Sequence, residues 1–386
     1  MNFNDLTLDE ARRSPGNKWN RFDADVIPSW VADMDFPVAK PIRDFIIDQG
    51  MRGDLKYTGD TSGTSIVDVF AERMLSKYGW NISSRDVDQM IDIVQGIYIA
   101  ISVFCEPNDE VIINTPMYFP ILQACRDLGR RMLFNPLVKQ KNRWEIDFDQ
   151  LEAKITERTK LLMLVNPHNP SGRVFTRTEL QQFADIALRH NLYVVADEIH
   201  CDLLFSDGGT HIPFASLGKD IANRTVTFNS ATKSHNLGGV RCAIVHFGSD
   251  DVRKRFESIS PRLRGGRNVV GNIATRIAWQ QCSDWLSNVM TYLEENRNHM
   301  QRQLNILMPD IKHIPNQATF LAWLDCSALN LGEDPFAFFL REARVAFSAG
   351  PTFGPEGENH VRLNFATSRQ ILDEKLNRMA HAINQR

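Results

Sequence analysis

The sequence has 386 residues, of which 43% are hydrophobic and 24% charged, a balance that is typical of a soluble globular protein with room for two domains. The formal net charge is −3 and the sequence pI is about 6.4, so no strong field of one sign favours nucleic acid or a membrane surface as a partner. The apolar runs are short, and none approaches the ~20 residues of a membrane span.

The predicted elements alternate between strands and helices along most of the chain. Up to about residue 40, the chain is rich in proline and aromatic residues, and we expect an arm rather than a domain. From about residue 60 to 248, apolar strand-like runs alternate with amphipathic helices, which predicts a layered α/β domain. The clear strand candidates span residues 111–114, 161–166, 192–196, 226–229 and 243–247.

Two helices are well marked. The first begins at Thr176, which forms a capping-box pattern with Glu179, and the apolar residues that follow fall on one face. The second is long, begins at about Ser283 and is expected to leave a large domain and to enter a smaller C-terminal one. We therefore expect a large domain at residues 46–285, while residues 1–45 and 286–386 form an N-terminal arm and a small domain.

Five polar clusters follow strand candidates or begin helices. Ligands gather at the carboxyl ends of strands in open α/β sheets. Each cluster also has a plain structural explanation, such as a turn, a helix cap, a surface lysine or a glycine that relieves crowding at a helix start. Short motifs have a high false-positive risk singly, so only their common order and spacing point to a site. The clusters span residues 95–98, 115–118, 166–172, 197–200 and 230–233, with Arg241 eight residues after Lys233.

The order and spacing of these clusters resemble the cofactor-binding signatures of the fold-type-I pyridoxal 5′-phosphate (PLP) enzymes, the aminotransferase class I/II superfamily. The resemblance covers nearly the whole chain. It implies an α/β fold like that of aspartate aminotransferase, in which a large PLP-binding domain has a mixed, mostly parallel central sheet and is joined to a smaller α/β domain. It also implies PLP as the cofactor, a small amino acid as the substrate and no metal ion.

The resemblance implies a role for each matching residue. Lys233 would form a Schiff base with PLP, Asp197 would pair with the pyridine nitrogen, and Arg362 would grip the substrate α-carboxylate. Tyr57 resembles a tyrosine that reaches the phosphate from the neighbouring subunit, which implies a homodimer and adds Tyr57 to the catalytic residues Lys233 and Asp197. The other implied cofactor contacts are Asn169 to the ring oxygen O3′, Tyr118 to the ring face, and Ser230, Arg241 and the backbone amides of Gly96, Ile97 and Tyr98 to the phosphate.

The chemistry explains why these residue types are needed. A carboxylate keeps the pyridine nitrogen protonated, so the ring can draw electrons from the substrate Cα. A lysine must lose its proton to attack a carbonyl, and a desolvated or cationic setting lowers its pKa. The same amine, released on substrate binding, can move the Cα proton. A phosphate is well held by amides at a helix N-terminus together with an arginine.

The segment at residues 27–36 (IPSWVADMDF) separates the branches of this superfamily. It resembles the opening segment of the cystathionine β-lyase, or C–S lyase, branch, in which Trp30 would lie at the substrate; the same aromatics could also simply cover core. His200 stands where many aminotransferases have a tyrosine. It would contact O3′ or be a core histidine hydrogen-bonded to backbone. Departures from the branch pattern occur at Ile97, Tyr98, His235 and residues 53–56.

The leading hypothesis is therefore a PLP-dependent β-eliminating lyase that acts on cystathionine or cysteine S-conjugates and yields pyruvate, ammonia and a thiol. An aminotransferase of an L-amino acid is the first alternative, and a PLP-binding regulatory protein is the second. Arg262, Arg264 and Arg267 form either a solvated basic loop or a recognition site for an acidic substrate side chain. Six scattered cysteines with no Cys-x-x-Cys pair argue against a disulfide framework and a zinc site, and they favour a reducing cytoplasm.

Overall fold

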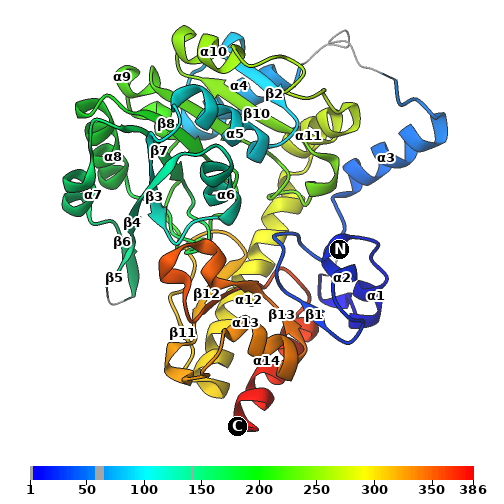
Figure 1. Ribbon diagram of the computed structural model, residues 1–386. Coiled ribbons are helices and arrows are strands. Elements are labelled where there is room, and N and C mark those ends of the chain that lie inside the picture. The colour runs from blue at the N-terminus through cyan, green and yellow to red at the C-terminus, as the bar shows by residue number, and fades with distance from the viewer. Residues whose placement is uncertain (1–2, 57–64, 141) are drawn as a thin grey trace.

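The computed structural model describes residues 3–56, 65–140 and 142–386. Its largest sheet has the strands β2 (Val87–Met90), β3 (Glu110–Thr115), β4 (Arg131–Pro136), β7 (Thr159–Val165), β8 (Tyr193–Asp197), β9 (Thr225–Asn229) and β10 (Ala243–Phe247). They lie in the order β2-β10-β9-β8-β7-β3-β4 (Figure 1). β10 is antiparallel to both of its neighbours and the other adjacent pairs are parallel, so the expected mixed, mostly parallel sheet is confirmed.

All five strand candidates are strands, and their observed ends lie within two residues of the expected ones. They read as continuous apolar runs because both faces of the sheet are covered. Val111 and Ile113 on β3 pack into the core on one face, whereas Ile112 between them packs into the core on the other. The period of two along a strand therefore sends neighbouring apolar residues into different layers.

Helices form the two layers that cover this sheet. One face packs against α5 (Ile93–Phe104), α6 (Phe119–Asp127) and α10 (Asp250–Glu257). The other face packs against α7 (Phe148–Lys154), α8 (Arg177–Arg189) and α9 (Lys219–Ala222), and α4 (Ile66–Tyr78) covers its β2–β10 edge. The predicted capping box is confirmed, because Thr176 and Glu179 bond to each other's backbone amides at the start of α8.

A second, antiparallel sheet contains β11 (Lys312–His313), β12 (Leu321–Asp325), β15 (His360–Asn364) and β14 (Ser348–Ala349), in that order. It shares a core with α14 (Arg369–Asn384) and with α12 (Ser283–Leu307), which begins where the sequence predicts. α12 runs from the large sheet down to this second sheet (Figure 1). α13 (Pro335–Phe338) lies beside the second sheet, and α11 (Val269–Gln281) precedes α12 in the chain. The exact domain boundaries at residues 46 and 285 stay a prediction.

The N-terminal segment packs against the C-terminal part of the chain. It contains α1 (Leu8–Arg12), α2 (Asn17–Asn20) and β1 (Ile27–Pro28), and β1 pairs in parallel with β13 (Val345–Ala346). α3 (Lys40–Arg52) then extends along the side of the molecule (Figure 1). A hairpin of β5 (Val138–Gln140) and β6 (Arg143–Glu145) projects from the other side. Among the described residues, no helix combines the length and the apolar character needed to cross a membrane.

Candidate active site

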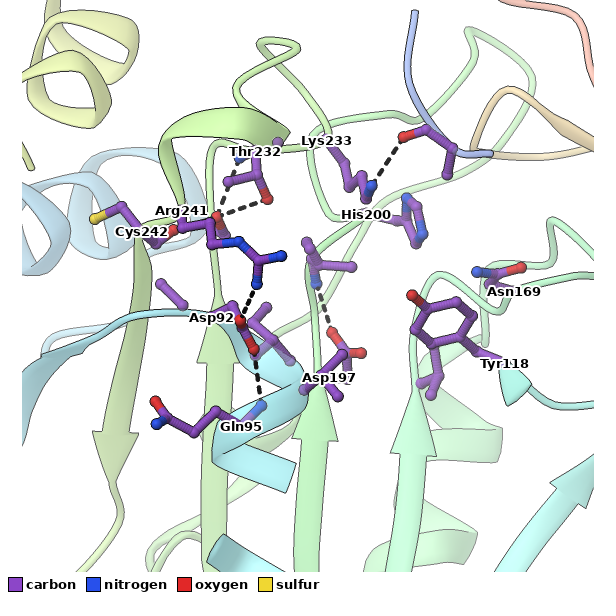
Figure 2. Close-up of a pocket in the computed structure, with 18 of the residues that line it drawn as sticks. Asp92, Gln95, Tyr118, Asn169, Asp197, His200, Thr232, Lys233, Arg241 and Cys242 are labelled. Carbon is purple, nitrogen blue, oxygen red and sulfur yellow. Dashed lines mark hydrogen bonds and ion pairs between the residues drawn. The ribbon is translucent and has the colours of Figure 1, made fainter. Parts of the chain in front are cut away.

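A cavity of about 560 Å³ opens at the carboxyl ends of β7, β8 and β9, beside the start of α5. Parallel strands end at the same edge of a sheet, so residues that follow different strands meet there. Figure 2 shows Lys233, Asp197, Tyr118 and Asn169 facing one space. Of the residues expected at the cofactor, those that line this cavity are Tyr98, Tyr118, Asn169, Asp197, His200, Ser230, Lys233 and Arg241.

Asp197 ends β8 and is buried at the floor of the cavity. One of its carboxylate oxygens accepts a hydrogen bond from the amide of Ile199 (3.1 Å). Burial raises the pKa of Asp197 to about 7, although this hydrogen bond and the nearby Lys233 favour the charged form. Burial thus leaves the Asp197 carboxylate with little to stabilise its charge. A cationic group placed against it would supply that stabilisation.

Lys233 lies four residues after the end of β9 and reaches across to the N-terminal segment. Its Nζ donates a hydrogen bond to the carbonyl oxygen of Ala32 (2.8 Å) and lies 3.7 Å from Oδ1 of Asp33. Burial lowers the pKa of Lys233, the Asp33 carboxylate opposes this shift, and the guanidinium of Arg362 reinforces it. A lysine with a lowered pKa is a better nucleophile and base at neutral pH.

Arg362 joins the second sheet to the large one. It lies on β15, and its Nη1 donates to Oδ1 of Asn169 (3.0 Å), which follows β7. Its Nη2 donates to the carbonyl oxygen of Trp30 (2.9 Å) and to Oγ of Ser348 (3.1 Å). Burial lowers the pKa of Arg362 to about 10, and its Nε has no hydrogen-bond partner among the described residues. A carboxylate ligand would compensate this buried cation.

The indole of Trp30 is not part of the cavity lining described above, and its expected contact with the substrate stays a prediction. The indole Nε1 donates to the carbonyl oxygen of Lys18 (3.3 Å), and the guanidinium carbon of Arg21 lies 4.5 Å from the ring centroid. The side chain therefore packs within the N-terminal segment, as the plain structural interpretation has it. Only the backbone carbonyl of Trp30 approaches the site, through Arg362.

The phosphate contacts expected from the backbone amides of Gly96, Ile97 and Tyr98 stay a prediction, and α5 begins at Ile93, two residues before the expected opening at Gln95. Asp92 caps this helix through a hydrogen bond from the amide of Gln95 (2.8 Å), and the amide of Gly96 already donates to the carbonyl of Asp92 (3.3 Å). The amides of Ile97 and Tyr98 lie deeper in the helix. The first-turn amides that have no acceptor inside the helix are those of Ile93 and Val94.

Gly96 and Tyr98 also have structural roles of their own. A Cβ at position 96 would collide with the ring of Phe228 on β9, so glycine is needed there for close packing of α5 on the sheet. The phenol of Tyr98 lines the cavity wall and donates to Asp127 (2.6 Å), which raises the pKa of Tyr98 to about 12. For Gly96, the plain explanation of a crowded helix start is therefore the one that the geometry supports.

The other residues expected at the phosphate lie together at the start of α5. Arg241 pairs with the Asp92 carboxylate (2.6 Å) and has a φ of 40°, which an arginine rarely adopts. Oγ of Ser230 donates to the carbonyl of Cys242 (2.6 Å) and accepts from the amide of Thr232 (3.1 Å). These side chains and the free amides of the first turn of α5 would suit an anion such as a phosphate.

His200 lies in the cavity wall. The sequence alone left open whether it contacts the ring oxygen O3′ or is a core histidine hydrogen-bonded to backbone. It is buried, and its Nδ1 has no hydrogen-bond partner among the described residues. Burial, with Lys233 and Arg362 nearby, lowers the pKa of His200 to about 3, so the imidazole is neutral. A buried polar nitrogen without a partner is rare in proteins, and it indicates that a ligand or water completes it.

Sequence reasoning did not single out two acidic residues that pair with site residues, Asp92 and Asp33. It also left open the roles of the basic loop and of Tyr57. Asp92 has a local signal, because an aspartate before an apolar helix is a preferred N-cap. Asp33 lies in the segment at residues 27–36 that the sequence singles out, but only the fold brings it to Lys233. In the basic loop, Arg264 and Arg267 lie 3.9 and 3.0 Å from carboxylate oxygens of Asp88, which favours the solvated loop. Tyr57 lies outside the described residues, so its expected role is untested.

Comparison with known proteins agrees with this geometry. A family model described as aminotransferase class I and II matches residues 68–382. The chain belongs to this family. Cystathionine beta-lyase PatB of Bacillus subtilis (strain 168) is 32% identical to it over 391 residues, covering 99% of this chain and 100% of PatB. The crystal structure of OvoB superposes with a TM-score of 0.92 at 36% identity over 97% of each chain.

A further member of this fold is described as containing PLP. Cystalysin from Treponema denticola has a TM-score of 0.93 to this chain at 27% identity, and each chain is covered to 100%. The class I and II site described above fits the same group. Asp197 offers a carboxylate for a protonated nitrogen, the start of α5 with Arg241 suits a phosphate, and the unpartnered Nδ1 of His200 suits a polar ligand atom.

Proposed function

We propose that this chain is a PLP-dependent carbon–sulfur β-lyase. It would cleave the Cβ–S bond of cystathionine or of a cysteine S-conjugate and, with one water, release pyruvate, ammonia and a thiol. The observation that carries the proposal is the convergence of Lys233, Asp197 and Asn169 on one cavity, with Arg362 hydrogen-bonded to Asn169. The choice of reaction is supported by the name of the full-length relative from Bacillus subtilis, a cystathionine beta-lyase.

The chain's own groups would each have one task. Asp197 would hold the pyridine nitrogen in its protonated form, while Arg241, Ser230 and the first turn of α5 would bind the phosphate. Asn169 and His200 would face the ring oxygen, and Tyr118 the ring. When bound, PLP supplies an electron sink for charge that develops at the substrate Cα.

The remaining steps belong to Arg362 and Lys233. The guanidinium of Arg362 would orient the substrate by its α-carboxylate, in the bidentate geometry that suits arginine. Nζ of Lys233, once free, would accept the proton from Cα and later return it to the departing sulfur. The carbonyl of Trp30 and the hydroxyl of Ser348 fix Arg362, so the substrate Cα would be presented to Lys233 in a set orientation.

The lyase and aminotransferase hypotheses predict different products from the same site. L-Cystathionine should give pyruvate and thiol over many turnovers with no 2-oxo acid added, because elimination needs only a leaving group on Cβ. Alanine and aspartate have no such group and should give at most one slow turnover without an acceptor. Pyruvate, measured with lactate dehydrogenase, and thiol, measured with a disulfide reagent, check this result.

The control for this prediction is the same assay with a 2-oxo acid added to alanine or aspartate. Rapid turnover that depends on the added acid, together with no pyruvate from thioethers, would replace the lyase by an aminotransferase. Absence of both reactions in protein that is loaded with PLP would favour the second alternative, a PLP-binding regulatory protein.

We also propose that the active unit is a homodimer. Large apolar side chains are exposed on α3 and just beyond it, where Met51 is 84% and Leu55 69% exposed, and we take them as the candidate dimer surface. Large contiguous apolar surfaces are normally covered by a partner. This surface ends two residues before Tyr57, the residue that by resemblance would serve the partner's phosphate. A second copy of the chain is therefore the proposed occupant.

The replacement Met51→Glu tests the dimer. It should shift the protein towards monomer in sedimentation and lower its activity in parallel, because a charge would have to be buried in the interface. Ile306→Glu on α12 is the matched control, since Ile306 is 71% exposed and lies outside this surface. Full activity of a monomer at the assay concentration would rule the proposal out.

The compartment is proposed on simpler grounds. All six cysteines are buried and free. Burial raises the pKa of Cys105, Cys125 and Cys201 to about 12, which keeps their thiols protonated and unreactive. A reducing cytoplasm is the compartment that suits such a set.

A further inference from the structure

The N-terminal segment supplies an acidic partner for Lys233. The Nζ of Lys233 reaches the carbonyl oxygen of Ala32 at 2.8 Å and Oδ1 of Asp33 at 3.7 Å. We propose that Asp33 is a positioning residue that binds the ε-ammonium group of Lys233 whenever this group is not bonded to the cofactor. The inference rests on the proposed function, because it assumes that Lys233 alternates between bonding PLP and carrying a proton.

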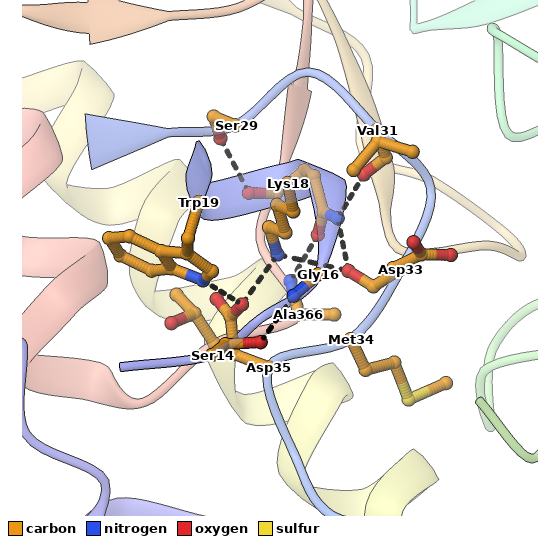
Figure 3. A network of polar contacts seen from close by, with 12 residues as sticks. Ser14, Gly16, Lys18, Trp19, Ser29, Val31, Asp33, Met34, Asp35 and Ala366 are labelled. Carbon is orange, nitrogen blue, oxygen red and sulfur yellow. Dashed lines mark hydrogen bonds and ion pairs between the residues drawn. The ribbon is translucent and has the colours of Figure 1, made fainter. Parts of the chain in front are cut away.

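The backbone of Asp33 is held by partners that leave its carboxylate free. Its carbonyl oxygen accepts hydrogen bonds from Nζ of Lys18 (3.0 Å) and from Nδ2 of Asn364 (2.7 Å). Lys18 also pairs with Asp35 (2.9 Å), which accepts from the indole of Trp19 (2.7 Å). Figure 3 shows this network, with the Asp33 carboxylate pointing away from Lys18 and Asp35. The backbone of Asp33 is therefore held from the side opposite to its carboxylate.

A second link ties the same segment to the loop of Lys233. Asn236, three residues after Lys233, donates through Nδ2 to the carbonyl oxygens of Met34 (3.0 Å) and Phe36 (2.8 Å). Its Oδ1 accepts from the amide of Met34 (3.0 Å). The backbone segments that carry the lysine and the aspartate are thus joined by hydrogen bonds other than the contact between the two side chains.

The space around Asp33 is matched to its carboxylate. A Cβ added at Gly238, which lines the cavity, would lie only 3.2 Å from Oδ1 of Asp33. At Gly239 no atom lies within 4 Å of such a Cβ. A side chain at position 238 would push the carboxylate, whereas one at position 239 would meet open space.

The charges around Lys233 leave Asp33 as the anion available to it. Among the residues that the structure describes, the titratable and charged groups that act on Nζ are Asp33, Asp197, His200 and Arg362. Arg362 repels an ammonium, His200 is neutral, and Asp197 is proposed to pair with the pyridine nitrogen. Asp33 would therefore stabilise the ammonium that forms when Nζ takes the Cα proton. This ion pair would end when the ammonium gives that proton to the departing sulfur.

The pKa of Lys233 in protein freed of PLP tests the proposal directly. Competitive acetylation over a pH series, followed by peptide mass spectrometry, measures this pKa without any turnover. Asp33→Asn should lower it by about one pH unit, since a nearby opposite charge favours the charged form. Asp9→Asn is the matched control, because Asp9 is 82% exposed on α1 and changes the net charge equally. An unchanged pKa in Asp33→Asn would overturn the proposal.

Gly238→Ala tests the position of the carboxylate rather than its charge. It should lower the pKa of Lys233 in the same direction by less, while Gly239→Ala should leave it unchanged. In the loaded enzyme, Asp33→Asn should lower kcat about tenfold with little change in KM, and should move the acid limb of the kcat profile to lower pH. If kcat and KM instead changed by similar factors and the acid limb did not shift, Asp33 would have only a structural role. That result would contradict the proposal.

These readouts separate the inference from the proposed function. Acetylation reports on Lys233 and Asp33 even in a protein that has no lyase activity. Failure of the lyase assay with a shifted pKa would reject the proposed reaction alone, and an unshifted pKa in an active lyase would reject the role of Asp33 alone.

Discussion

Lys233→Ala is expected to abolish turnover, with a loss of at least about 10³-fold, because one residue supplies both the bond to the cofactor and the proton-transferring amine. The variant should also lose the yellow colour of the lysine-bound cofactor. Lys254→Ala, an exposed lysine on α10, is the matched control and should behave like the wild type.

Borohydride gives the same prediction a second readout. Reduction of the wild-type protein should join the cofactor to Lys233, and peptide mass spectrometry should find the adduct there. The geometry supports this site, since Lys233 is the lysine in the lining of the cavity formed by the described residues. An adduct mapped to a different lysine would end the assignment.

Asp197→Asn is expected to lower kcat roughly 10²-fold, which corresponds to about 3 kcal/mol in activation free energy, with a smaller effect on KM. Asparagine keeps the shape of the side chain and can still accept the hydrogen bond from the amide of Ile199. It loses the charge that would keep the pyridine nitrogen protonated, so the loss should fall on the chemical step. Asp185→Asn, on the exposed face of α8, is the control.

The same variant has an expected pH dependence. In the cofactor-free protein, burial raises the pKa of Asp197 to about 7, so the carboxyl group is increasingly neutral below this pH. Pairing with a protonated nitrogen requires the ionised form. Cofactor affinity should therefore fall as the pH drops through 7 in the wild type, and Asp197→Asn should show a smaller fall. A wild-type rate and a wild-type pH profile in the variant would contradict the assigned role.

Much of the large sheet could be predicted because its signals are local. Strands that are covered on both faces need continuous apolar runs, and these appear in the sequence where β3, β7, β8, β9 and the antiparallel β10 lie. The capping box at Thr176 is also complete within four residues. Lys233, Asp197 and Asn169 follow such strands, and the common edge of a parallel sheet brings them together.

The start of α5 and the packing of Trp30 depend on alternatives that sequence alone does not rank. Asp92 competes with later residues for the helix start, and its cap with Gln95 moves the first turn away from Gly96. Trp30 could face the substrate or the N-terminal segment, and the carbonyl of Lys18 with the guanidinium of Arg21 holds it in the segment.

The sequence by itself determined the layered α/β fold and the lysine and aspartate at its strand ends, since both depend on short-range patterns. Only the tertiary structure decided which distant groups meet them. Arg362 reaches Asn169 across 193 residues, and Lys233 reaches Ala32 across 201. No local pattern encodes such pairs, because the packing of β15 and of the N-terminal segment against the large sheet sets their distances. The charge that Lys233 experiences is therefore a property of the fold.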